Sequence, residues 1–243
     1  MTLYTEKLIR GQFSNISFYT GIEAFYNMGF EIIEVESFNN LNIVQDNIFL
    51  GSIDFIHSAL RKLNIPIPEP NDYPISLKNF IGRNISESTI EKISNNPDLW
   101  NVFVKPKGTL KKFAGRLVKT THDLVGCGDR ENIVPIWVSD PVDFMSEWRV
   151  FVRYNKIIGV KSYKGDWRSQ YDYRIIEDAV RSYENAPAGY AIDFGLTSDG
   201  KLLIVEVNEG YSIGSYGLFY VDYAKLISAR WAELTGQIDL CDF

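Results

Sequence analysis

Two acidic residues and an amide lie close together in the segment YAIDFGLTSDGKLLIVEVNEG (residues 190–210). They are Asp193, Glu206 and Asn208. Asp199-Gly200 predicts a two-residue hairpin turn of type I′, because such a turn needs positive φ at both central residues. This turn pairs Asp193 directly with Glu206 and places Asn208 on the same face of the hairpin.

The predicted register gives the hairpin one apolar face, formed by Ile192, Phe194, Leu196, Leu203, Val205 and Val207. On the other face, two opposed carboxylates repel each other and stay ionised together only near a cation. Two carboxylates and an amide oxygen suit Mg²⁺, which usually takes its remaining ligands from water and substrate phosphates. These residues therefore predict a magnesium site. The alternative is a solvent-facing polar strand.

A basic loop follows the strand that ends at Lys105, in VFVKPKGTLKKFAG. Its glycines allow backbone amides to approach an anion, and its lysines supply positive charge. No Walker P-loop is present. The loop predicts a phosphate cover, with a solvated basic turn as the alternative. Its contributing residues are Lys107, Gly108, Lys111, Lys112 and Gly115.

Arg149 lies among apolar residues in MSEWRVFVRYNKIIGVKSYKG, on the same strand face as Glu147. A partly buried guanidinium must find hydrogen-bond partners. The following strand carries Lys161 and Lys164. A three-residue connection would pair Arg149 directly with Lys161, whereas a two-residue connection would not, and the sequence leaves this register open.

Two further segments are candidates for ligand contact. IVPIWVSDPVDF is an apolar, edge-like segment followed by acids, which could present backbone groups to a base and Asp140 or Asp143 to a ribose. NEGYSIGSYGL follows the predicted metal-binding strand directly. Its glycines allow close turns around a ligand and its aromatic residues could wall an acceptor pocket. The alternative is a loop that only packs the last helix onto the sheet.

The composition predicts a soluble globular protein: the chain has 243 residues, 45% of them hydrophobic, and a net charge of −6. This charge argues against broad contacts with nucleic-acid phosphates. No apolar run is long enough to span a membrane, and the first residues lack the apolar stretch of a signal peptide. Two cysteines fit a reducing compartment, so we expect a cytoplasmic location.

Hydrophobic periodicity predicts mixed helices and strands. We expect helices over residues 17–29, 53–64 and 221–234, and a short helix over 86–97 with Ser86 or Ser88 as its N-cap. Strands are expected over residues 30–37, 47–52, 101–106, 116–121, 133–139 and 147–163, and in the hairpin already described.

In chain order, a lysine with its basic loop, an apolar segment with acids, Glu-x-Arg, a second lysine, an aspartate and Glu-x-Asn resemble the ATP-grasp superfamily. More narrowly, the chain resembles the subgroup named for one arginine and two lysines, a domain-of-unknown-function type. The segments that carry this likeness run from Gly51 to Leu218: GSIDFIHSALRKL, YPISLKNFIGRNI, FVKPKGTLKKFAGRLV, SEWRVFV and VEVNEGYSIGSYGL.

The resemblance implies ATP and Mg²⁺ as cofactors and assigns a role to each motif. Nucleotide contacts would come from Lys105, Lys107, Gly108, Lys112, Ile136, Trp137, Val138 and Asp140. The metal ligands would be Asp193, Glu206 and Asn208, and Arg149 and Lys161 would steady the transferring phosphoryl group. Substrate contacts are predicted at Tyr211, Ser212, Tyr216 and Lys164.

The fold class that the resemblance implies is α+β, an ATP-grasp fold whose two α+β subdomains clasp ATP. We expect a small N-terminal α/β domain over residues 1–90 and the ATP-grasp domain over residues 91–243. The implied activity is that of an ADP-forming ligase, which joins a carboxylate and an amine through an acyl phosphate. The alternatives are a non-catalytic nucleotide-binding module and a phosphotransferase. The expected partner is a small molecule, an amino acid or a peptide, rather than a nucleic acid or a membrane.

Overall fold

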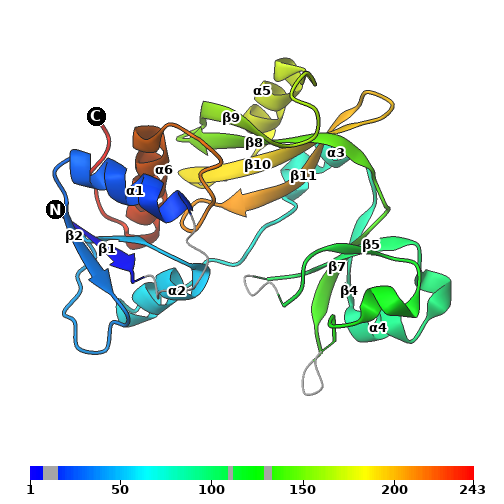
Figure 1. Ribbon diagram of the computed structural model, residues 1–243, viewed down its shortest axis with the longest axis horizontal. Coiled ribbons are helices and arrows are strands. Elements are labelled where there is room, and N and C mark those ends of the chain that lie inside the picture. Colours follow the sequence, from blue (N-terminus) through cyan, green and yellow to red (C-terminus); the bar gives the residue numbers. More distant parts are fainter. Residues whose placement is uncertain (8–15, 109–111, 129–132) are drawn as a thin grey trace. The chain divides into compact units, whose positions relative to one another are not determined.

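The computed structural model describes residues 1–7, 16–108, 112–128 and 133–243 of the chain (Figure 1). Two compact units make up the fold. The first unit combines Met1–Phe80 with Met145–Phe243, and the second unit is the continuous segment Ile81–Phe144. The domain boundary predicted at residue 90 falls inside the second unit. That division into two domains stays a prediction.

The amino-terminal part of the first unit is a three-stranded parallel sheet of order β2-β1-β3. Parallel neighbours require crossover connections, and helices supply them here. Helix α2 begins after Ser52, whose side chain accepts a hydrogen bond from the amide of Phe55. The elements are β1 (Thr2–Glu6), α1 (Ile16–Asn27), β2 (Glu31–Val35), β3 (Ile48–Leu50) and α2 (Ile53–Lys62).

A four-stranded sheet of order β11-β10-β8-β9 forms the rest of the first unit together with two helices (Figure 1). One core runs through this unit, since Phe151 of β8 and Ala191 of β10 are buried with α6 and with Phe49 of β3. The elements are β8 (Phe144–Arg153), β9 (Lys156–Lys164), α5 (Tyr173–Ser182), β10 (Gly189–Thr197), β11 (Leu202–Glu209) and α6 (Tyr220–Thr235). A short 3-10 turn, η1 (Ile75–Leu77), leads into α3 (Lys78–Ile81).

The second unit is an antiparallel sheet of order β4-β7-β5-β6 with its own small core. Val104 of β5 and Ile136 of β7 are fully buried in that core, together with Ile90 and Ile93 of α4. The elements are β4 (Ile85–Thr89), α4 (Ile90–Ser94), η2 (Pro97–Leu99), β5 (Val102–Pro106), β6 (Arg116–Val118), η3 (Thr121–Leu124) and β7 (Pro135–Ser139).

Most of the predicted elements are present, but the helix predicted over residues 86–97 is wrong. Residues 85–89 form β4, which pairs with β7, and the helix is confined to Ile90–Ser94. Its N-cap is Thr89, whose Oγ1 accepts a hydrogen bond from the amide of Lys92 at 3.2 Å, rather than Ser86 or Ser88. Serine and threonine are weak helix formers, so strand pairing decides the conformation of this segment. Strand β1 and helix α5 were not predicted.

The β10–β11 hairpin keeps the predicted pair Asp193–Glu206, although its turn differs from the prediction. The amide of Gly200 donates to the carbonyl of Thr197 at 3.0 Å, and Gly200 has a φ of 82°. Asp199 has no positive φ, so a type I′ turn is excluded. The connection is a three-residue loop, in which a glycine takes the left-handed conformation.

A bulge between Asp193 and Phe194 compensates for the longer loop. Beyond it, Phe194 pairs with Ile204, so the predicted partner Val205 is the extra residue. The predicted apolar face is therefore wrong in β11. Leu202 and Ile204 are buried there, whereas Leu203 and Val205 are only partly buried.

Within the described residues, no helix is long and apolar enough to cross a membrane.

Candidate functional site

Four charged side chains lie in a row across the sheet of the first unit. Lys161 of β9 pairs with Arg149 of β8, and Asp193 of β10 pairs with Glu206 of β11. Because β8 and β10 are neighbours in the sheet, the row reads lysine, arginine, aspartate, glutamate. Asn208 lies two residues beyond Glu206 and shares its face. The structure thus brings together the predicted catalytic and metal-binding residues of this unit.

Arg149 and Asp193 form a buried, bidentate ion pair. The Nε and Nη2 atoms of Arg149 donate to the two carboxylate oxygens of Asp193 at 2.7 and 2.6 Å. Only 7% of Arg149 and 2% of Asp193 are exposed. Burial opposes the charge of Arg149, but the hydrogen bonds and charge of Asp193 prevail and raise the pKa of the guanidinium. The cation expected beside Asp193 is therefore supplied, at least in part, by the protein itself.

Burial raises the pKa of Asp193, and the nearby charge of Glu206 raises it further. Arg149 and Asn208 act in the opposite direction. The Nδ2 of Asn208 donates to Asp193 at 3.1 Å, which leaves its carbonyl oxygen as the atom able to coordinate a cation. An additional cation near Glu206 would relieve the repulsion that Asp193 experiences.

The donor set fits a magnesium ion in two of its three predicted ligands. Glu206 and Asn208 offer the hard oxygen atoms that Mg²⁺ prefers. A carboxylate has about four acceptor positions, and Arg149 and Asn208 occupy three of those on Asp193. Asp193 therefore acts on an ion mainly through its charge. Among the described residues, no group of three His, Cys, Asp or Glu side chains could hold a metal.

The pairing of Arg149 with Lys161, left open by the sequence, is direct. It arises from a two-residue turn, since Tyr154 and Asn155 both have positive φ. The turn alone would offset the two residues. A bulge between Phe151 and Val152 restores the direct pair.

Aromatic residues surround Arg149, and the sequence analysis did not identify Tyr163 among them. The Cζ of Arg149 lies 4.5 Å from the ring centroid of Tyr216 and 5.9 Å from that of Tyr163. The Tyr163 hydroxyl donates to Glu147 at 2.7 Å, and the Nζ of Lys164 is 2.6 Å from the same carboxylate. The predicted substrate residue Lys164 is thus an ion-pair partner of Glu147. An aromatic residue two positions after Lys161 was the available signal.

The loop after β11 places its predicted substrate residues in different surroundings. Tyr211 is 2% exposed, and its hydroxyl lies 3.0 Å from the Nε2 of His57, which is also buried. The Oγ of Ser212 donates to the carbonyl of Gly51 at 2.8 Å. Tyr216 is 46% exposed. Tyr211 and Ser212 therefore attach this loop to helix α2, and a role in substrate binding stays a prediction.

In the second unit, Lys105 of β5 lies directly opposite Trp137 of β7, and Trp137 lies opposite Glu87 of β4. These residues share the face turned away from the core, since Val104 and Ile136 are buried on the other face. The Nζ of Lys107 lies 4.9 Å from the ring centroid of Trp137 and 2.5 Å from a carboxylate oxygen of Glu87. Lysines and an aromatic ring thus meet on one face of this sheet.

Strand β7 is internal, which corrects the prediction of an edge-like segment. It pairs with β4 on one side and with β5 on the other, so its backbone groups are used within the sheet. Ile136 is fully buried and Val138 packs against the same core. Asp140, just after the strand, accepts hydrogen bonds from the amide and side chain of Asn84 at 3.1 and 2.9 Å. Base recognition through the backbone of Ile136–Val138 is therefore ruled out by the strand's position.

The phosphate cover predicted over residues 107–115 lies partly outside the described residues, since 109–111 are not among them. Gly108 has a φ of 109°, a conformation that favours glycine. Lys112 is exposed.

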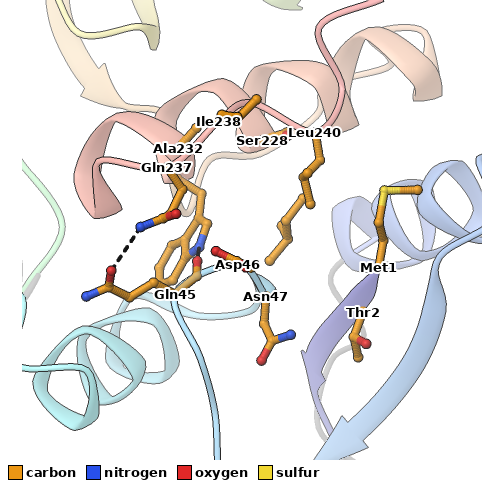
Figure 2. Close-up of a pocket in the computed structure, with 12 residues that line it drawn as sticks. Met1, Thr2, Gln45, Asp46, Asn47, Ser228, Ala232, Gln237, Ile238 and Leu240 are labelled. Carbon is orange, nitrogen blue, oxygen red and sulfur yellow. Dashed lines mark hydrogen bonds between the residues drawn. The ribbon is translucent and has the colours of Figure 1, made fainter.

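A cavity of about 430 Å³ opens in the first unit between the loop before β3, the start of β1 and the end of α6 (Figure 2). The Nε2 of Gln237 donates to the Oε1 of Gln45 at 3.0 Å beside it. None of the predicted site residues lines this cavity.

Comparisons with known proteins agree with the predicted fold. Residues 80–226 match the model of a family described as an ATP-grasp domain, the second family of its clade. No curated protein sequence matches the chain significantly. The similarities to solved structures confirm the predicted ATP-grasp fold of mixed helices and strands.

Three of these solved structures are D-alanine–D-alanine ligase from Bacillus anthracis, L-amino acid ligase from Bacillus licheniformis and a RimK domain ATP-grasp protein from Sphaerobacter thermophilus. The first is 15% identical, with a TM-score of 0.56, and the match covers 97% of this chain and 99% of that one. The second is 11% identical, with a TM-score of 0.57 and coverage of 96% and 75%. The third is 14% identical, with a TM-score of 0.54 and coverage of 93% and 98%.

Proposed function

This chain belongs to that ATP-grasp domain family, and from this premise we propose that it is a Mg²⁺- and ATP-dependent carboxylate–amine ligase. The proposal includes residues 91–243 as the ATP-grasp domain and residues 1–90 as a preceding α/β domain. It also includes a cytoplasmic location and a small-molecule, amino-acid or peptide substrate.

The observation that best supports the proposal is the row of charges across the four-stranded sheet. Two cations, Lys161 and Arg149, lie beside two carboxylates, Asp193 and Glu206. A transferring phosphoryl group carries negative charge on its oxygens, so it needs adjacent cations, while a metal bound to the same phosphates needs anionic ligands. The row offers both kinds of group on one surface.

Each cation then has a distinct role. Arg149 and Lys161 neutralise the transferring phosphoryl group, and Lys105 binds the phosphates of the nucleotide. These three residues are our candidates for the arginine and two lysines of the subgroup. Lys107 and Lys112, with Gly108, belong to the phosphate cover, and Trp137 and Asp140 contact the base and ribose.

Glu206 and Asn208 would hold Mg²⁺, with the charge of Asp193 behind them. When bound, the ion would neutralise charge on the phosphates. The substrate carboxylate attacks the γ-phosphorus of ATP, and ADP leaves. An amine then attacks the acyl phosphate and expels inorganic phosphate, which forms the amide. The protein's part is positioning and charge neutralisation, so the reaction needs no nucleophilic side chain.

A screen for ADP release tests the proposal. The chain is incubated with ATP, MgCl₂ and pools of amino acids and short peptides, and positive pools are examined by mass spectrometry. A ligase gives ADP together with a product lighter by one water than the sum of the two substrates. Glu206→Gln, the matched control, should release no ADP above background.

The same screen separates two alternatives. A phosphotransferase would give a product heavier by one phosphoryl group, and a non-catalytic nucleotide-binding module would bind Mg·ADP without substrate-dependent ADP release. The solved structures of similar fold include ligases, and this similarity favours the ligase over the other two.

A further inference from the structure

Tyr216 is held in an unusual position by the loop after β11. Its φ is 43°, in the left-handed region that a bulky residue rarely adopts. A Cβ at Gly214 would lie only 2.9 Å from the Tyr216 ring. Strained backbone of this kind persists only where the surrounding structure enforces it. The loop therefore fixes the ring over a definite surface.

That surface is the guanidinium of Arg149. The Tyr216 ring centroid lies 4.5 Å from its Cζ, and the Tyr163 ring lies 5.2 Å from the Tyr216 ring at an interplanar angle of 43°. Tyr163 is in turn fixed by its hydrogen bond to Glu147. Asp193 holds the Nε and Nη2 edge of the same guanidinium.

Arg149 is thus restrained by a carboxylate at one edge and by aromatic rings beside its plane. The Nη1 group is the part left to donate to a ligand, because the Nε and Nη2 edge is bonded to Asp193. A cation beside an aromatic ring gains from the ring's electrostatics, and the gain is larger when water is excluded. Arg149 is 7% exposed although it lies next to a half-exposed tyrosine, so the ring also screens it from solvent.

We propose that Tyr216 is a positioning residue that, with Tyr163, fixes the plane of Arg149 and directs its Nη1 group toward the transferring phosphoryl group. The phosphoryl part of this inference depends on the proposed function, whereas the restraint on Arg149 does not. It differs from the prediction that Tyr216 lines an acceptor pocket, because it places the effect in the chemical step rather than in acceptor binding.

The restraint can be tested without any substrate. In NMR spectra of the full chain, the Nε–Hε signal of Arg149 is assigned with Arg149→Lys, and its exchange with water is measured. We expect Tyr216→Ala to speed this exchange by about tenfold, as loss of a desolvated cation–π contact predicts, and Tyr216→Phe to leave it unchanged. Phe219→Ala is the control, because Phe219 is an exposed aromatic of the same segment that contacts Tyr220.

A second variant guards against a trivial loss of structure. Gly214→Ala leaves the tyrosine in place but displaces its ring, so it should speed the exchange of the same proton. Unchanged exchange in both Tyr216→Ala and Gly214→Ala, at an unchanged melting temperature, would overturn the proposal.

The catalytic part is tested with the acceptor that the ADP-release screen identifies. Tyr216→Ala should lower kcat by about tenfold with the acceptor KM unchanged, because Arg149 acts in the transition state, and Tyr216→Phe should restore kcat. A raised acceptor KM with normal kcat would show instead that the ring lines the acceptor pocket. If no pool releases ADP, the proposed function fails, while the exchange measurement still decides whether Tyr216 restrains Arg149.

Discussion

At the scale of single residues, the molecule answers the electrostatic problem of Asp193 in a way that the sequence did not indicate. Two opposed acids suggested a metal ion between them. In the structure Arg149 binds Asp193 through both carboxylate oxygens, so Glu206 and Asn208 remain as the better ligands. Both Arg149 and Asp193 were identified from the sequence. Their contact was not, because it joins β8 to β10 across residues far apart in the chain.

Glu206 should make nucleotide binding depend on a divalent ion. We expect calorimetry to show Mg·ADP binding to the unmodified chain, and at least tenfold weaker binding either in EDTA or in Glu206→Gln, since about 1.4 kcal/mol of lost affinity is tenfold. Asp199→Asn, a change in an exposed acid at the turn of the same hairpin, is the control and should bind normally. Equal ADP affinity with and without EDTA would contradict the metal assignment.

The Arg149–Asp193 pair should show strong thermodynamic coupling. Arg149→Met leaves a buried, unpaired carboxylate and should lower the free energy of unfolding by about 3–5 kcal/mol. Adding Asp193→Leu removes that charge, so the double variant should lose less than the sum of the two single changes. Urea unfolding of the four proteins measures the coupling. Additive losses would show that the two residues do not depend on each other.

At the scale of elements, both hairpins show what local sequence can and cannot determine. In β10–β11 a three-residue loop and a one-residue bulge cancel, so Asp193 still faces Glu206 as a two-residue turn predicted. In β8–β9 a two-residue turn and a bulge place Arg149 opposite Lys161. Bulges depend on packing against the rest of the sheet and have no reliable sequence signal. The functional pairs were therefore predictable, whereas the apolar face of β11 was not.

The segment after α6 is anchored by Asp239. Its Oδ2 accepts hydrogen bonds from Arg153 at 2.7 Å and from Tyr154 at 3.0 Å, and its Oδ1 accepts from Ser228 and the amide of Cys241. Burial raises the pKa of Asp239, but these hydrogen bonds outweigh it and hold the pKa below its usual value.

A lowered folded-state pKa means that the anchor stabilises the protein above the unfolded pKa of about 3.9 and loses this effect as the pH falls through the folded value. We expect Asp239→Asn to lower the free energy of unfolding by about 1–3 kcal/mol at pH 6. The difference from the unmodified chain should shrink toward zero below pH about 3. Urea unfolding from pH 2 to 7 measures it, and a difference independent of pH would contradict the role of the charge.

At the scale of the whole molecule, the family resemblance predicted the fold, while local patterns failed where long-range pairing decides. Residues 85–89 were assigned to a helix and form β4 because β7 lies beside them. Strand β1 lay in the first fifty residues, which matched no known pattern, and it is identified only by its pairing with β2 and β3. The division into two units also depends on contacts between Met1–Phe80 and Met145–Phe243, which no local signal reveals.

The second unit, Ile81–Phe144, is continuous in sequence and has a smaller core than the first unit. A small core buries less apolar surface, so we expect this unit to open at a lower free energy than the rest of the molecule. In native-state hydrogen exchange, the amides of Val104 and Ile136 should exchange through a cheaper opening than those of Phe151 and Ala191.

Nucleotide contacts in the second unit give this measurement a functional readout. Mg·ADP at about 100 times its dissociation constant should slow exchange at Val104 and Ile136 through up to about 2.7 kcal/mol of added stability, because a ligand that binds only the closed form opposes its opening. Lys105→Ala should remove most of the slowing, since Lys105 is the residue proposed to bind the phosphates there. Lys119→Ala, an exposed lysine just after β6 in the same unit, is the matched control. If Mg·ADP bound to the chain and left exchange in the second unit unchanged, Lys105 and Trp137 would have no part in the nucleotide site.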